Sequence, residues 1–164
     1  MKNERKFAAW CTLWLAVFVL LSVNMAQAQK KSKYACTEPN PESLCSAANT
    51  CGSATTPCTV QIKKDGQGAT VTPSIPDAKK NKVFCVKTGT KMNFEAKSKN
   101  TGFVVDFGPS SPFDKEDSIV GGSSKPDSAV AKNAGCYKYS AGACVSGAIY
   151  GMCGTQIAEM VITK

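Results

Sequence analysis

Cysteine is the residue type in this sequence that offers the most chemistry, and histidine is absent. The chain has 164 residues, with nine cysteines and no histidine. Without histidine it cannot form a Ser-His or Cys-His catalytic pair, a histidine-ligated zinc site, or a mononuclear copper site built on two imidazoles and a thiolate. The sulfur chemistry that remains is disulfide formation, metal binding through soft ligands, or thiol redox exchange.

The first 28 residues have the pattern of a secretory signal peptide, which sets the redox environment of the rest. A basic segment at 1–6 precedes an apolar run at 7–25, and Ala26-Gln27-Ala28 is a small-x-small cleavage pattern. We therefore expect cleavage after Ala28 and export to the periplasm or the medium. The alternative is an uncleaved anchor, because the apolar run approaches the length that spans a bilayer.

Eight cysteines remain after cleavage, and an even number in an exported chain predicts four disulfides. Sequence does not choose among the 105 possible pairings. Short spacing favours pairs within the group 36–58 and a clamp between Cys136 and Cys144. Cys85 and Cys153 would then close a long loop. The eight are Cys36, Cys45, Cys51, Cys58, Cys85, Cys136, Cys144 and Cys153.

Metal binding and redox catalysis are the alternatives for these cysteines. The sequence has no C-x-x-C pair, so the spacing of a zinc ribbon or of a redox-active dithiol is missing. Cys144, Met152, Cys153 and Met160 offer the soft sulfur ligands that suit Cu(I). Disulfide formation would remove their thiolates, so we expect no metal and no cofactor.

Paired carboxylates are the remaining candidates for catalysis. Asp114, Glu116 and Asp117 cluster in one turn, and such carboxylates can act as general acid and base. The same turn holds Lys115, and acidic turns with a lysine are typical of solvated surface. We therefore predict no catalytic residue.

Charge is moderately basic. The net charge is +8, and the predicted signal peptide carries three positive charges and one negative, which leaves +6 on the mature chain. The lysines are scattered, mostly in predicted turns, and no platform of aromatic and basic residues is present. We expect a solvated surface, no nucleic-acid partner, and no membrane span after signal cleavage.

The elements that must position these residues are β-strands. Residues 29–58 are polar and rich in proline and cysteine, which predicts a disulfide-tied N-terminal loop region. From residue 59 short apolar runs alternate at period two between turn signals, and no stretch has a helical period. The predicted strands are 59–62, 70–72, 83–86, 91–96, 103–107, 137–139 and 156–163.

About seven short strands predict one all-β domain at 59–164, a Greek-key β-sandwich. Residues 108–135 are rich in glycine, serine and proline, and we expect at most a two-residue edge strand at Ile119-Val120 and another short one near 128–130. The predicted core residues are Val60, Ile62, Val83, Met92, Phe94, Phe103, Val105, Phe107, Tyr139, Met160 and Ile162.

The order of these segments resembles cupredoxin-like (plastocyanin-like) domains over residues 59–164. Residues 83–94 (VFCVKTGTKMNF) resemble their strand–glycine turn–strand unit, and 98–107 (SKNTGFVVDF) the segment that carries their first copper-binding histidine. Residues 135–144 (GCYKYSAGAC) resemble the strand that leads to their cysteine ligand, and 151–162 (GMCGTQIAEMVI) their last loop and strand. The resemblance implies a cupredoxin-like sandwich.

The copper ligands of that family are missing. Thr101-Gly102 stands at the position of the first histidine and Ala141 at the position of the cysteine, and no histidine follows. The stretch from Cys153 to Met160 also resembles the binuclear-copper loop of oxidase subunit II, but Ile157 and Ile149 stand where that loop has a histidine and a second cysteine. The resemblance therefore implies the scaffold without its copper.

Three functions compete on this basis. The first is an exported, non-enzymatic domain that binds a partner or has a structural role at the cell envelope, with loops 108–135 and 140–155 as its binding face. Tyr137, Tyr139 and Tyr150 belong either to that face or to the packing. The second is a copper-binding or electron-transfer protein with Cys and Met ligands, for which free thiols would be the sign. The third is a hydrolase using the acidic turn.

Overall fold

A computed structural model of the chain describes Cys36 and residues 38–76, 78, 83–114, 118–151 and 158–164. The predicted signal peptide, Glu116, Asp117, Met152 and Cys153 lie outside these residues. Within them the chain forms ten strands and one short 3-10 helix, η1 (Pro41–Leu44). No helix in this part of the chain has the length and apolar character needed to cross a membrane.

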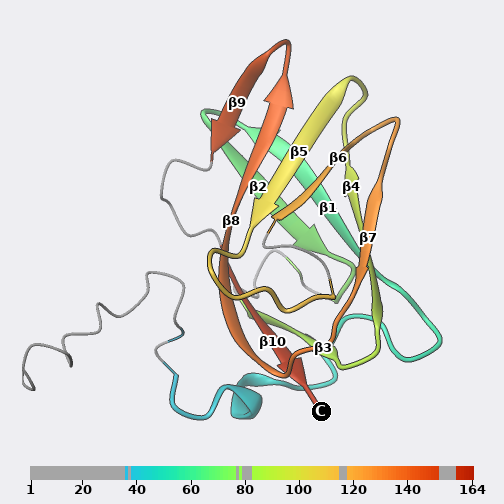
Figure 1. The fold of residues 1–164 in the computed structure, drawn as a ribbon, viewed down its shortest axis with the longest axis vertical. Coiled ribbons are helices and arrows are strands. Elements are labelled where there is room, and N and C mark those ends of the chain that lie inside the picture. The colour runs from blue at the N-terminus through green and yellow to red at the C-terminus, as the bar shows by residue number, and fades with distance from the viewer. Residues whose placement is uncertain (1–35, 37, 77, 79–82, 115–117, 152–157) are drawn as a thin grey trace, which may run out of the picture. The chain divides into compact units, whose positions relative to one another are not determined.

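The prediction of an all-β sandwich is confirmed, and both of its sheets are mixed (Figure 1). The smaller sheet has the order β2-β1-β4-β7, in which β1 and β4 run parallel. Its strands are β1 (Cys58–Asp65), β2 (Gly68–Pro73), β4 (Lys91–Ala96) and β7 (Asp127–Val130).

The larger sheet has the order β3-β10-β8-β5-β6, with β9 paired to the second half of β8. β3 and β10 run parallel, and the other pairs are antiparallel. Its strands are β3 (Val83–Lys87), β10 (Ala158–Thr163), β8 (Gly135–Val145), β5 (Thr101–Asp106), β6 (Ser118–Gly122) and β9 (Ala148–Gly151).

The core lies between the two sheets and follows the period-two pattern of the strands. Ten of the predicted core residues are at most 2% exposed, and Val83 is the exception. In β3 the inward residues are Phe84 and Val86, so the prediction for Val83 had the wrong face. An unbroken apolar run gives no alternation from which to choose the face. The rings of Phe94, Phe107, Phe113 and Tyr139 pack edge to face or tilted in the core.

Several strands are longer than the sequence predicted, and β1 spans eight residues where four were expected. β6 spans five residues where at most two were expected, and β8 spans eleven where three were expected. The added residues are small. Ala141 and Ala143 face the core, while Ser140, Gly142 and Cys144 alternate with them, so the sequence lacks the bulky alternation that marks a strand. The short strand expected near 128–130 is β7. The regions read as loops at 108–135 and 140–155 also contain β6, β9 and the second half of β8.

The N-terminal loop region is tied down by disulfides, as predicted. We call residues 38–51 the strap. It contains η1, has no strand of its own, and leads to β1 (Figure 1). The strap lies along β3 and contacts β10.

Candidate functional site

Six of the eight predicted disulfide cysteines form three disulfides. Cys36 is bonded to Cys136, Cys45 to Cys85, and Cys51 to Cys58. Short spacing was thus a correct guide for Cys51–Cys58 alone, and the other local pairings were wrong. Cys136 and Cys144 lie on the same strand eight residues apart, which places them roughly 25 Å apart and too far for a bond.

Cys85 and Cys136 are bonded to the N-terminal region because of where the sheet places them. Val161 of β10 pairs with Cys85 on one side and with Cys136 on the other, so all three share one row on the outer face of the larger sheet. Cys36 and Cys45 bond to the two ends of this row. Val161 is 0% exposed although it points away from the core.

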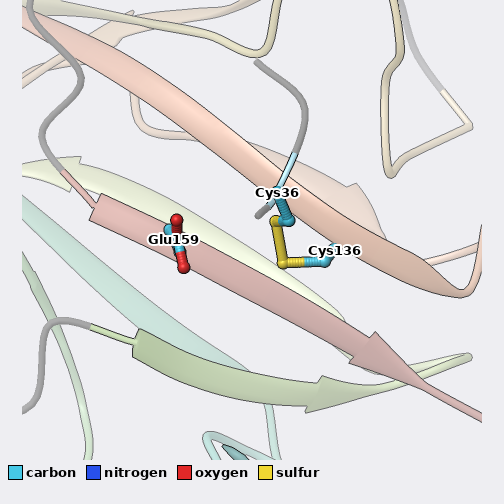
Figure 2. Close-up of side chains that lie close together, drawn as sticks. All are labelled: Cys36, Cys136 and Glu159. Atoms are coloured by element: carbon cyan, nitrogen blue, oxygen red, sulfur yellow. A yellow bond between two sulfur atoms is a disulfide. The ribbon is translucent and has the colours of Figure 1, made fainter. Parts of the chain in front are cut away.

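One group of metal-ligand types occurs among the described residues, and it is built on a disulfide. The ligand atoms of Cys36, Cys136 and Glu159 lie within 4.8 Å of one another (Figure 2). The two sulfur atoms are bonded to each other, so neither is a thiolate ligand. The Glu159 carboxylate instead pairs with the Lys138 ammonium at 3.4 Å. In the oxidised chain these three residues therefore form a disulfide beside an ion pair.

Cys144 and Met160, the described members of the sulfur set considered for Cu(I), do not lie close together. Cys144 lies on the outer face of β8 and forms no disulfide with any described cysteine. Met160 is fully buried between the sheets and pairs with Tyr137, seven residues from Cys144 along β8. At the rise of a β-strand, this separation is roughly 20 Å. One metal ion cannot contact both.

The positions that correspond to copper ligands in cupredoxin-like domains do not converge either. Thr101 pairs with Val145 and Ala141 pairs with Val105 in the β5–β8 ladder. The two positions are therefore four residues apart along β5, or roughly 13 Å. Ala141 is fully buried, and the Thr101 hydroxyl donates to the Lys99 carbonyl oxygen at 3.2 Å.

Asp114, the carboxylate of the acidic turn that the structure describes, forms a hydrogen bond to the backbone. The Asp114 carboxylate accepts a hydrogen bond from the backbone N–H of Val130 at 3.3 Å. This bond ties the 108–114 segment to the edge of β7, next to the Phe113–Ala131 bridge.

The three tyrosines have different surroundings. Tyr139 packs against Phe84 and Phe107, and burial raises its pKa strongly. No described group bonds to its hydroxyl. The Tyr137 hydroxyl donates to the Asn133 carbonyl oxygen at 3.0 Å, and burial also raises its pKa. The Lys64 ammonium lies 4.2 Å from the centre of the Tyr150 ring.

The strongest surface feature is an apolar face on the half of the larger sheet that the strap leaves bare. Val120 and Ile149 are 65% and 62% exposed. Val120, Val104 and Gly142 form one row across the sheet. Gly102, Cys144 and Ile149 form the next row. Neither row contains a charged residue, and we call these six residues the bare face, in which Gly142 alone is buried.

The outer face of the smaller sheet is different in kind. Thr59, Gln61, Thr72 and Asn93 occupy it with Glu95, whose carboxylate accepts a bond from the Gln61 amide at 3.0 Å. A polar sheet face of this type is satisfied by water. The bare face has no such groups, and exposed apolar patches on soluble domains mark interaction sites. The sequence also suggested a binding surface at residues 108–135 and 140–155, but as loops and not as a sheet face.

No protein-family model matches this chain, and no curated protein matches it.

Proposed function

We propose that this chain is an exported, non-enzymatic domain of the cupredoxin-like class that binds a protein partner through the bare face. The observation that carries the proposal is the exposure of Val120 and Ile149 on a sheet whose other half is covered. An uncharged surface in which glycines flank branched side chains fits an apolar protein surface. Its place of action is the periplasm or the medium.

The resemblance to cupredoxin-like domains supports the proposed fold class. The segments that carry it occupy β3 and β4, β5, β8 and β10, which together span both sheets of the sandwich. The absence of histidine from the sequence supports a scaffold without a type 1 copper site.

The test is a comparison of partner retention by three forms of the mature chain. The face variant carries Val120→Asp and Ile149→Asp, and the control carries Thr72→Asp on the exposed outer face of the smaller sheet. All three substitutions are at solvent-exposed positions, so each should change the free energy of unfolding by less than about 1 kcal/mol. We expect the wild type and the control to retain the same envelope protein and the face variant to lose it. Equal retention by the face variant would contradict the proposal.

A copper-binding protein with Cys and Met ligands is the second candidate, and Cys144 is the observation that favours it. This residue is partly exposed and makes no disulfide within the described part of the chain. Cu(I) titration of the native protein under a competing chelator would test this function. Binding that the Cys144→Ser variant abolishes would support it, and binding no tighter than that of the variant would end it.

A further inference from the structure

The strap is held on the sheet by covalent and polar contacts, with little apolar burial. η1 has no buried residue, and Leu44 is 36% exposed. Asn49 and Cys51 are the only buried residues among its described positions. Because burial of apolar surface is the main source of docking energy, the strap without its disulfides would have little to hold it in place.

The strap nevertheless pairs with the edge of β3 that faces away from β10. The Cys85 backbone N–H donates to the Asn49 carbonyl oxygen, and the Cys51 N–H donates to the Cys85 carbonyl oxygen, both at 2.8 Å. Thr50 and Cys85 thus form a parallel bridge. On its other side β3 pairs with β10, so the strap takes the place of a further strand.

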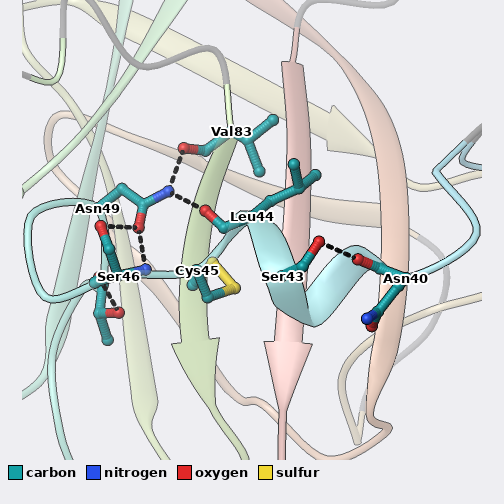
Figure 3. The surroundings of a disulfide bond; sticks show 9 residues. Asn40, Ser43, Leu44, Cys45, Ser46, Asn49 and Val83 are labelled. Atoms are coloured by element: carbon teal, nitrogen blue, oxygen red, sulfur yellow. Dashed lines mark hydrogen bonds between the residues drawn. A yellow bond between two sulfur atoms is a disulfide. The ribbon is translucent and has the colours of Figure 1, made fainter.

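The Asn49 side chain extends this pairing by one peptide-like group (Figure 3). Its Nδ2 donates to the carbonyl oxygens of Val83 at 3.4 Å and Leu44 at 2.9 Å. Its Oδ1 accepts from the Ser46 backbone N–H at 2.7 Å. The amide therefore links the edge of β3 to the turn that follows η1.

The disulfides differ in access. Cys36 and Cys136 are both half-buried, and Cys45 is half-buried although its partner Cys85 is 1% exposed, whereas Cys51 and Cys58 are both 0% exposed. A thiolate must reach a disulfide sulfur to reduce it, so Cys36–Cys136, just before the strap, is open at both sulfurs, Cys45–Cys85 is open at Cys45, and Cys51–Cys58 is protected.

We propose that the strap is a reducible guard over a latent strand-docking edge. For each of Cys36–Cys136 and Cys45–Cys85, one molecule of an external dithiol gives two electrons and two protons and is itself oxidised to a disulfide, so two dithiol molecules leave four thiols on the chain. The strap then leaves β3, while Cys51–Cys58 stays intact. The exposed N–H and C=O of Cys85 and the C=O of Val83 accept an extended peptide in the parallel register that residues 49–51 now occupy.

The occupant is an extended peptide strand, because the strap fills this edge mainly through its own backbone. The hydrogen bonds to β3 come from the main chain of Asn49 and Cys51 and from one side-chain amide, that of Asn49. A partner strand with asparagine and small residues would satisfy the same groups. This site is separate from the bare face and does not depend on the proposed function.

The first experiment is limited reduction of the native mature chain with dithiothreitol, followed by alkylation and peptide mapping. We expect labelling of Cys36, Cys45, Cys85 and Cys136 at least about tenfold faster than labelling of Cys51 and Cys58. Amide hydrogen exchange at Cys85 should rise about 100-fold on reduction, while Met160 and Ile162 keep their protection. Equal labelling of all three disulfides, or an unchanged rate at Cys85, would overturn the proposal.

The second experiment measures binding of a fluorescent peptide that spans residues 44–52 with Cys45→Ser and Cys51→Ser. The opened form carries Cys36→Ser, Cys136→Ser, Cys45→Ser and Cys85→Ser, and the control carries Cys51→Ser and Cys58→Ser. We expect the peptide to bind the opened form and the reduced wild type but neither the control nor the oxidised wild type. If the opened form does not fold, the reduced wild type carries the test. No binding to the reduced wild type, or equal binding to both redox forms, would contradict the proposal.

Discussion

Cys85 and Cys136 stand in one register row of the larger sheet, on either side of Val161. Each is bonded to the N-terminal region, so the disulfides bracket a valine that faces away from the core and is nevertheless 0% exposed. The outer face of this sheet is therefore divided into a covered half and the bare half that contains Val120 and Ile149.

Val161→Ala should destabilise the protein although its side chain lies on the outer face. The substitution removes two buried carbon atoms, which corresponds to a loss of about 2 kcal/mol in the free energy of unfolding. Val120→Ala is the matched control, because Val120 is 65% exposed and should cost less than about 0.5 kcal/mol. Denaturant titration measures both. Equal effects would mean that the strap does not bury Val161 in solution.

Tyr139→Phe should stabilise the protein. The buried Tyr139 hydroxyl has no partner among the described groups, so removing it relieves an uncompensated desolvation, worth about 1 kcal/mol. Tyr137→Phe should have the opposite sign, because it removes the 3.0 Å bond to the Asn133 carbonyl oxygen. The free energy of unfolding near neutral pH tests the pair. A loss of stability in Tyr139→Phe would show that the hydroxyl has a partner in solution.

Stability should fall at alkaline pH because of Tyr139. Burial raises its folded pKa above the ordinary value of 10.0, so the unfolded chain releases this proton at lower pH than the folded chain. The contribution is fully present below pH 10 and is lost as pH rises above it, by up to about 1.4 kcal/mol per pH unit. The difference in stability between wild type and Tyr139→Phe, measured from pH 8 to 11, isolates this residue. A difference that does not change with pH would contradict the assignment.

Gly121→Ala should destabilise the corner where β6 turns toward β7. A Cβ at Gly121 would lie 2.7 Å from Phe103 Cζ and 2.8 Å from the Lys125 carbonyl oxygen. The phenyl ring can shift, but the carbonyl oxygen is backbone, so overpacking should cost about 1–3 kcal/mol. Gly68→Ala, whose nearest contact would be 3.5 Å, is the control. Similar midpoints of thermal unfolding for both variants would disprove the close approach.

Cys144 should react with a maleimide in the native protein. The sequence predicted that all eight cysteines of the mature chain are in disulfides, whereas Cys144 has no described partner and is partly exposed. We expect labelling at Cys144 before any reductant is added. Labelling that requires a reductant even after denaturation would restore the prediction of a fourth disulfide.

The sequence predicted the fold class and most of the core because bulky residues alternate in β1, β4 and β5. It failed where side chains are small or the apolar run is unbroken. Ala141 and Ala143 carry no alternation of size, and the run at 83–86 does not show that Phe84 faces the core. The pairing of Cys85 and Cys136 with the N-terminal region depends on the β3-β10-β8 strand order, which is a long-range property.

The bare face could not be predicted from the sequence either, because it too depends on the order of the strands. Val120 and Ile149 are 29 residues apart, and they share a face because β6, β5, β8 and β9 lie side by side in one register. The predictions of a signal peptide and of a cupredoxin-like domain rest on the sequence and remain predictions.

Native mass spectrometry of the exported protein, before and after denaturation without reductant, tests the central claim most directly. We predict a chain that begins at Gln29, has a mass at least about 6 Da below the all-thiol value for its three disulfides, and carries no metal. A copper adduct that is lost only on denaturation would contradict the account of a cupredoxin-like scaffold that works without copper, and so would a mass that retains every thiol.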